Sequence, residues 1–173
     1  KEMKNQRMLD ELTELMRIDV SSGQETEIAE HLVKKLEQMG FAITRDEAGA
    51  TFGGVCGNIL AVREGERDGV VCFCSHMDRV PGGIGIKPVE EDGILRSSGD
   101  TILAADDLSG VAAILEGVRQ AIESGKALPK LEILFTVGEE AGLYGAKAFD
   151  VSLLTSKTMY VLDSPGRILS LIH

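Results

Sequence analysis

One histidine and several carboxylates in this sequence follow directly after apolar, strand-like runs. The first run, residues 70–75, leads into His76 and then Asp78. Further acidic groups follow apolar runs of their own: Asp106-Asp107, Glu139-Glu140 and Asp163. Imidazole and carboxylate groups are ligands for zinc and similar divalent cations. Because carboxylates gathered in one crevice repel one another unless a cation lies among them, the set predicts a site for two metal ions.

Each of these groups also has an ordinary structural interpretation. His76 and Asp78 alone are typical of a hydrogen-bonded histidine beside a turn aspartate. Asp107 is placed to cap the helix that follows it. Asp163 precedes Ser-Pro-Gly, a sequence typical of a turn. The recurrence of the pattern after successive apolar runs favours a metal site over these separate interpretations.

Two cysteines raise the alternative of a Cys-Cys-His metal site. Cys72 and Cys74 share the strand parity of His76. Residues two apart on a strand lie about 6.6 Å from one another, too far for neighbouring ligands about 2.3 Å from one ion. We therefore predict that both thiols are buried in the core.

The elements that must position these groups alternate between helices and buried strands. Apolar residues recur at helical spacing within residues 3–18, 22–39 and 107–124. Shorter apolar runs predict strands at 41–45, 58–63, 70–75, 131–137 and 159–162, and Asp-Gly predicts a hairpin of 86–89 with 94–97. This alternation predicts an α/β fold with a largely parallel sheet. The carboxyl ends of parallel strands meet at one edge, so we expect the functional groups to converge there.

The second predicted helix carries two local expectations. Ser22 and Glu25 form a capping-box pattern, which predicts that the helix starts between them. His31 falls on the polar face of this helix, so we expect it to be exposed to solvent rather than to bind a metal.

The composition limits the class of protein. A chain of 173 residues with 43% hydrophobic content can bury a core, and this length predicts one domain. The formal net charge of −10 argues against nucleic acid or an anionic membrane as a partner. No apolar run approaches the roughly 20 residues of a membrane span. Two of the three cysteines lie on one strand with poor disulfide geometry, which favours the reducing cytoplasm.

Both ends of the sequence indicate a piece of a longer protein. Lys1 is not an initiator methionine, and residues 168–173 form an apolar, strand-like run. We therefore expect further sequence after His173.

Four motifs, taken in this order, carry a resemblance to a known family. They are Ser-His76-Met-Asp78, Ala-Ala-Asp106-Asp107-Leu-Ser-Gly, Val-Gly-Glu139-Glu140 and Val-Leu-Asp163-Ser. Together they resemble the co-catalytic zinc peptidases, the superfamily of carboxypeptidase G and the aminoacylases, and above all peptidase T and peptidase T-like proteins. The resemblance implies that residues 1–173 are the amino-terminal segment of a three-layer α/β/α catalytic domain with a mostly parallel mixed sheet. The lid or dimerisation domain and the carboxyl-terminal catalytic segment would be absent.

The resemblance also implies the metal ligands. His76 and Asp163 would bind one zinc ion, and Glu140 would bind a second. Asp106 would bridge the two ions, which lie roughly 3.5–4 Å apart in such sites. The cofactor would be two Zn²⁺ per complete site, with Co²⁺ or Mn²⁺ in substitution. The peptide bond between Asp106 and Asp107 would be cis.

Two catalytic roles follow from the same resemblance. Asp78 would orient the imidazole ring of His76 by accepting its second N–H. Glu139 would be the general base, taking a proton from a metal-bridging water and passing it to the leaving amine.

This sequence departs from the family pattern at two points. Arg79 stands where the family usually has threonine, which would place a cation near the mouth of the site. The fifth metal ligand of the family is a histidine far downstream, and His173 follows Asp163 too closely to replace it. We therefore expect residues 1–173 alone to bind at most one zinc ion tightly and to be nearly inactive.

The resemblance implies zinc-dependent hydrolysis of short peptides by a cytoplasmic, tripeptide aminopeptidase-like enzyme, with a homodimer as a further expectation. An N-acyl-amino-acid deacylase, a dipeptidase and a carboxypeptidase of the same superfamily are alternatives. A non-catalytic metal-binding or dimerising fragment is the alternative from another class. The number of bound metal ions, measured together with peptidase activity, distinguishes these classes.

Overall fold

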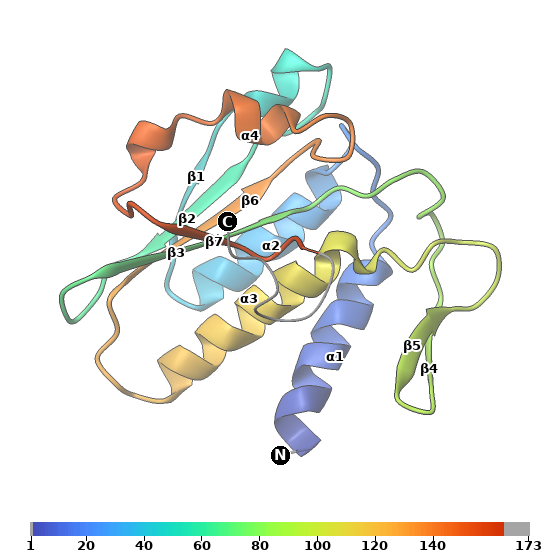
Figure 1. The fold of residues 1–173 in the computed structure, drawn as a ribbon, viewed down its shortest axis with the longest axis horizontal. Helices are drawn as coiled ribbons and strands as arrows, with labels where there is room; N and C mark the ends of the chain where they lie inside the picture. The colour runs from blue at the N-terminus through green and yellow to red at the C-terminus, as the bar shows by residue number, and fades with distance from the viewer. Residues whose placement is uncertain (1, 165–173) are drawn as a thin grey trace.

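A computed structural model describes residues 2–164 as a mixed sheet with helices on both faces (Figure 1). The helices are α1 (Glu2–Met16), α2 (Thr26–Gln38), α3 (Ala105–Glu123) and α4 (Tyr144–Ala148), with 3₁₀ helices η1 (Ala48–Thr51) and η2 (Val151–Leu153). The strands are β1 (Ala42–Arg45), β2 (Ile59–Arg63), β3 (Val70–His76), β4 (Pro88–Glu91), β5 (Ile94–Ser97), β6 (Lys130–Thr136) and β7 (Met159–Val161). None of the described helices is both long and apolar enough to cross a bilayer. The apolar run at 168–173 and His173 lie outside the described residues.

The main sheet has the strand order β1-β2-β6-β3-β7. β3 runs parallel to β6 and to β7, whereas β2 runs antiparallel to β1 and to β6. The predicted α/β fold with a mixed sheet is therefore confirmed, and its described pairings divide evenly between the two directions. His76 pairs with Thr136, so β3 and β6 end at the same edge of the sheet.

Helices α1, α2 and α3 cover one face of the sheet, and α4 lies over the other (Figure 1). The larger core lies on the three-helix side and includes Leu32, Leu115 and Ile133. A smaller apolar cluster on the opposite face consists of Leu60, Cys74, Leu134 and Phe149. Both sides of the central strands are therefore buried, as the continuous apolar runs predicted.

The two strand cysteines are free and buried, which confirms that they are core thiols. Burial raises the pKa of both Cys72 and Cys74 to about 12. Both thiols are therefore protonated at neutral pH, as expected of side chains in the core.

The predicted hairpin is also confirmed. β4 and β5 pair antiparallel through Glu91 and Ile94, and they project from the body of the fold (Figure 1). Asp92 and Gly93 form the two-residue turn with φ values of 53° and 72°. Positive φ at both positions is the geometry that makes Asp-Gly a strong hairpin signal.

Arg79 is buried, which corrects the expectation of a cation at the mouth of the site. Its residue exposure is 1%. The guanidinium donates to the carbonyl oxygens of Leu15, Met16 and Ile18 at 3.4, 3.3 and 2.8 Å, and to that of Gly83 at 3.0 Å. The last carbonyls of a helix lack partners within the helix and carry partial negative charge. Arg79 therefore caps the end of α1 and fixes it to the loop after β3.

Replacing Arg79 with alanine should lower the free energy of unfolding by about 3 kcal/mol, because buried carbonyl groups lose their donors. Arg67 provides a matched control, since it is exposed and also donates to a backbone carbonyl, that of Ala127 at 3.2 Å. Arg67→Ala should change the same free energy by less than about 0.5 kcal/mol. Urea denaturation measures both values, and equal effects would contradict the capping role.

Candidate metal centre and catalytic site

The structure brings the predicted ligands together at one edge of the sheet. His76 ends β3, Glu140 follows β6, Asp163 follows β7 and Asp106 lies in the first turn of α3. Ligand atoms of His76, Asp106 and Glu140 lie within 4.8 Å of one another, and so do those of Asp106, Asp107 and Asp163. Asp106 belongs to both groups. The Asp106–Asp107 peptide bond is cis, as the resemblance implied.

The two ring nitrogens of His76 face different partners. Nε2 points into the crevice, 3.2 Å from Asp106 Oδ1 and 4.0 Å from Asp163 Oδ2. Nδ1 lies 3.0 Å from the carbonyl oxygen of Asp78 and 3.4 Å from its Oδ1. Burial acts to lower the pKa of His76, but the carboxylates of Asp78, Asp106 and Asp163 outweigh it and raise the pKa to about 9. This arrangement holds the ring through Nδ1 and leaves Nε2 for a cation.

Asp78 joins the end of β3 to the turn that carries the two glutamates. Its side chain is 0% exposed. Oδ1 accepts the backbone N–H of Glu139 at 2.9 Å, and Oδ2 accepts that of Glu140 at 3.1 Å and the hydroxyl of Ser22. Burial acts to raise the pKa of Asp78, but hydrogen bonds from His76, Ser22 and Glu139 hold it below its usual value. A buried carboxylate with this many donors is held in its charged form.

Ser22 and Glu25 do not form the predicted capping box. α2 starts at Thr26, and Glu25 before it makes no side-chain cap bond. Ser22 donates to Asp78 instead, and Glu25 Oε1 accepts the backbone N–H groups of Gly23 and Gly138 at 2.9 and 3.0 Å. Sequence reasoning missed the contacts of Ser22 with Asp78 and of Glu25 with Gly138, because a local pattern carries no signal for partners this far along the chain.

The neighbouring aspartates Asp106 and Asp107 have different environments. Asp107 is buried, and its oxygens accept the hydroxyl of Ser75 at 2.5 Å and the N–H of Gly110 at 3.1 Å. It therefore caps the helical part of α3, which confirms the predicted capping role. Burial raises the pKa of Asp107 to about 6. The Asp106 side chain is 73% exposed and faces the crevice. The contribution of Ser75 was missed, and its only sequence signal is a hydroxyl inside an apolar strand.

The acidic crevice suits a divalent metal ion. Burial and neighbouring carboxylates raise the pKa of both Glu139 and Glu140. Within residues 2–164, no lysine or arginine forms an ion pair with these glutamates or with Asp106, Asp107 or Asp163. One imidazole and several carboxylates without a lysine or arginine counter-ion form a donor set that fits zinc, cobalt or manganese.

A small apolar cavity of about 240 Å³ opens beside these ligands. It reaches His76, Glu139 and Asp163 at one end, and the apolar residues that line it include Leu134, Phe149, Val151 and Met159. A larger hollow of about 720 Å³ lies at the opposite edge of the sheet, beside Arg63 and Ile122. That hollow contains none of the predicted ligands, so it is separate from the candidate site.

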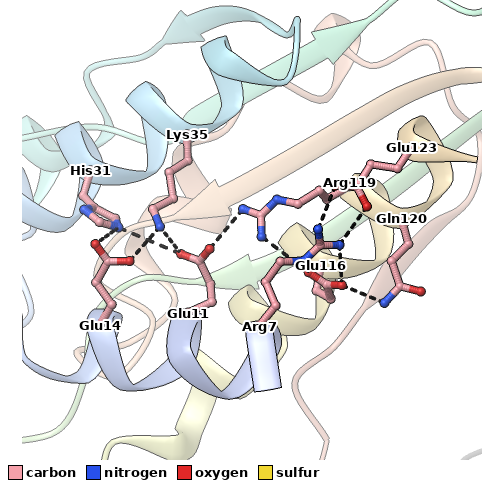
Figure 2. A network of polar contacts seen from close by, with 9 residues as sticks. All are labelled: Arg7, Glu11, Glu14, His31, Lys35, Glu116, Arg119, Gln120 and Glu123. Atoms are coloured by element: carbon pink, nitrogen blue, oxygen red, sulfur yellow. Dashed lines mark hydrogen bonds and ion pairs between the residues drawn. The ribbon is translucent and has the colours of Figure 1, made fainter. Parts of the chain in front are cut away.

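A second cluster of ligand-type residues lies between α1 and α2 (Figure 2). Glu11, Glu14 and His31 form it, but the ammonium of Lys35 is 2.7 Å from both carboxylates. His31 Nε2 is 4.0 Å from Glu11 and 3.9 Å from Glu14. A lysine already balances the charge there, so we interpret this cluster as an ion-pair network. His31 is half-buried rather than exposed, and burial lowers its pKa.

The same network continues to α3 (Figure 2). Arg119 donates to Glu11 at 3.1 Å, and Arg7 donates to Glu116 and Glu123 at 2.7 Å each. It therefore joins the three helices that cover one face of the sheet.

The sequence and the fold both match known peptidases. Residues 58–164 match the model of Peptidase family M28, and the chain belongs to this family. It is 38% identical over 167 residues to the uncharacterised protein YqjE of Bacillus subtilis (strain 168), covering 96% of this chain and 45% of that protein. Peptidase T of Salmonella enteritidis is 36% identical over 75 residues, which cover 42% of this chain and 18% of that enzyme. The predicted resemblance to peptidase T-like proteins is confirmed.

Two solved structures share the fold closely. The aminopeptidase PepT of Bacillus cereus ATCC 10987 superposes with a TM-score of 0.91 at 39% identity, covering 94% of this chain and 44% of that one. A tripeptidase of Staphylococcus aureus superposes with a TM-score of 0.88 at 34% identity, covering 93% and 44%. The chain thus spans less than half the length of each of these relatives.

Asp78→Ala should weaken binding of a divalent metal by about 10–100-fold, because the turn bearing Glu140 loses its acceptor and His76 loses a charged neighbour. Ser22→Ala removes one hydrogen bond to the same carboxylate and should weaken binding less than about 3-fold. Calorimetric zinc titration of the full-length proteins measures both effects. Unchanged affinity in Asp78→Ala would contradict this role.

Proposed function

We propose that the protein containing this chain is a cytoplasmic metal-dependent peptidase that hydrolyses short peptides and resembles tripeptide aminopeptidases. The observation that carries the proposal is the convergence of one imidazole and several carboxylates, with Asp106 shared by both ligand groups. The similarity to an aminopeptidase and a tripeptidase supports the substrate class.

The resemblance to peptidase T-like proteins suggests how two ions would be held, although the groups of neighbouring ligand atoms place His76 with Glu140 and Asp163 with Asp107. His76 and Asp163, with Asp106, would hold one ion, and Glu140 would hold the second together with Asp106. Zinc is the proposed metal, with cobalt or manganese in substitution, and when bound it would polarise the scissile carbonyl and lower the pKa of water.

Glu139 is proposed as the general base. It belongs to neither group of ligand atoms, although its side chain borders the same crevice. Its carboxylate would take a proton from the attacking water and deliver it to the departing amine. Its raised pKa moves it towards neutrality, where a base both accepts and returns a proton efficiently. Asp78 supports this role because it holds the backbone N–H of Glu139.

The apolar cavity beside the ligands suggests a place for the substrate. Its lining, which includes Leu134, Phe149 and Met159, would receive an apolar side chain while the peptide bond lies near His76 and Glu139. We therefore expect short peptides with an apolar residue next to the cleaved bond to be preferred.

Substituting the paired glutamates should separate their roles. Glu139→Gln should lower kcat for a tripeptide by about 10²–10⁴-fold with zinc content unchanged, because a base is lost and no ligand is lost. Glu140→Gln should instead reduce the zinc bound per chain. The exposed hairpin residue Glu91 provides a control, and Glu91→Gln should change neither quantity.

Metal analysis and steady-state kinetics on the full-length proteins make this comparison. Equal zinc loss in the Glu139 and Glu140 variants would show that the roles are wrongly assigned. Full activity in Glu139→Gln would refute the proposed mechanism.

A further inference from the structure

Buried side chains hold four consecutive backbone amides in the turn that carries the paired glutamates. The acceptors come from three other segments of the chain, and each of the three residues is at most 1% exposed. The contacts are Val137 N–H to Asn58 Oδ1 (3.1 Å), Gly138 N–H to Glu25 Oε1 (3.0 Å), Glu139 N–H to Asp78 Oδ1 (2.9 Å) and Glu140 N–H to Asp78 Oδ2 (3.1 Å). Side chains rather than neighbouring strands therefore set the course of this turn.

Glu25 is a member of this set to which the proposed chemistry assigns no role. Its side chain is completely buried, and one oxygen, Oε1, takes the N–H groups of both Gly23 and Gly138. Within the described residues, Oε2 has no hydrogen-bond partner. Burying a carboxylate is costly. The Glu25 carboxylate is buried despite this cost, and it accepts the backbone N–H of Gly138, the residue directly before Glu139.

The backbone at Gly138 is closely surrounded by other groups. Its φ is +60°, and a Cβ atom there would lie 2.6 Å from the ring of Phe52. Phe52 in turn stacks on Tyr144 at a centroid distance of 4.9 Å. The backbone at Gly138 is therefore held by Glu25 at its amide and bordered by the ring of Phe52 beside its Cα.

We propose that Glu25 is a positioning residue, which sets the location of the Glu139 carboxylate by holding the Gly138 amide. The inference rests on the proposed function, since it takes Glu139 as the general base. Catalytic groups lose efficiency steeply when displaced, and a shift of about 1 Å costs about 10²-fold. Without Glu25, the buried Gly138 amide would lack an acceptor, and the turn would move to find one.

Glu132 offers a matched control within the same sheet. It is a completely buried carboxylate that also accepts two backbone N–H groups, those of Thr155 and Ser156 at 2.8 and 3.0 Å. It pairs with Cys72, four residues before His76 on β3 and so about 13 Å from the site end of that strand. Removing Glu132 therefore also takes away a completely buried carboxylate and two backbone hydrogen bonds, but at a distance from the paired glutamates.

The test compares Glu25→Ala, Glu25→Gln, Glu25→Asp and Glu132→Ala in the full-length protein with a tripeptide substrate. Glu25→Ala, measured at saturating zinc, should lower kcat by about 10–100-fold with KM within about 3-fold. Glu132→Ala should leave kcat within about 2-fold at a temperature where both variants are folded. Glutamine keeps an acceptor oxygen at the same reach and should recover most of kcat. The aspartate side chain is one methylene shorter, so Glu25→Asp should not recover kcat.

Two kinetic results would overturn the inference: equal kcat losses in Glu25→Ala and Glu132→Ala, or a higher kcat in Glu25→Asp than in Glu25→Gln. If Glu25→Ala does not fold, the comparison of kcat between Glu25→Gln and Glu25→Asp still tests the inference.

Hydrogen exchange of the Gly138 and Glu139 amides in metal-free protein gives a readout independent of activity. Exchange should accelerate at least about 10-fold in Glu25→Asp and stay unchanged in Glu25→Gln, and the reverse order would refute the inference. An inactive wild-type protein would refute the proposed function alone, because the exchange comparison would still test the positioning.

Discussion

The buried carboxylate of Asp78 is the interaction on which the arrangement of the candidate site depends. It joins the end of β3, which carries His76, to the turn after β6, which carries Glu139 and Glu140. Several carboxylates must lie close together in this crevice, and their mutual repulsion tends to push the elements apart. Hydrogen bonds from backbone amides stabilise the Asp78 charge in the interior and fix the turn against that repulsion.

Two different solutions to buried charge appear in this fold. Between α1, α2 and α3, acidic and basic side chains pair with one another (Figure 2). Beside the candidate site, Arg79 is bound by backbone carbonyls, whereas Glu25 and Asp78 are bound by backbone amides. Backbone dipoles stabilise Arg79 and Glu25 without a second ionised side chain in direct contact, and at Asp78 they act together with the neighbouring imidazole of His76. Within the described residues, the crevice consequently keeps its negative charge, which favours a bound divalent cation.

Local patterns predicted the elements and the candidate ligands because the relevant information is local. Helical periodicity, apolar runs and the Asp-Gly turn each act over a few residues, and Asp106 and Glu140 follow such runs directly. Arg79, Ser22 and Glu25 could not be interpreted in the same way. Each of them has a partner far along the chain, and the partners of Arg79 and Glu25 are backbone atoms that any residue could supply. His31 was misplaced because the polar face of α2 packs against the ion pairs of α1.

The Asp106–Asp107 pair shows how environment assigns roles to identical side chains. Asp107 is buried, accepts hydrogen bonds from Ser75 and Gly110, and has a pKa raised to about 6 by burial. Its oxygens are already engaged in beginning the helical part of α3. Asp106 is largely exposed, shares the crevice with His76, and belongs to both groups of candidate ligands. Two aspartates adjacent in the sequence therefore divide into a helix cap and a candidate bridging ligand. Burial and hydrogen bonding, rather than residue type, decide which of them is free to bind a metal ion.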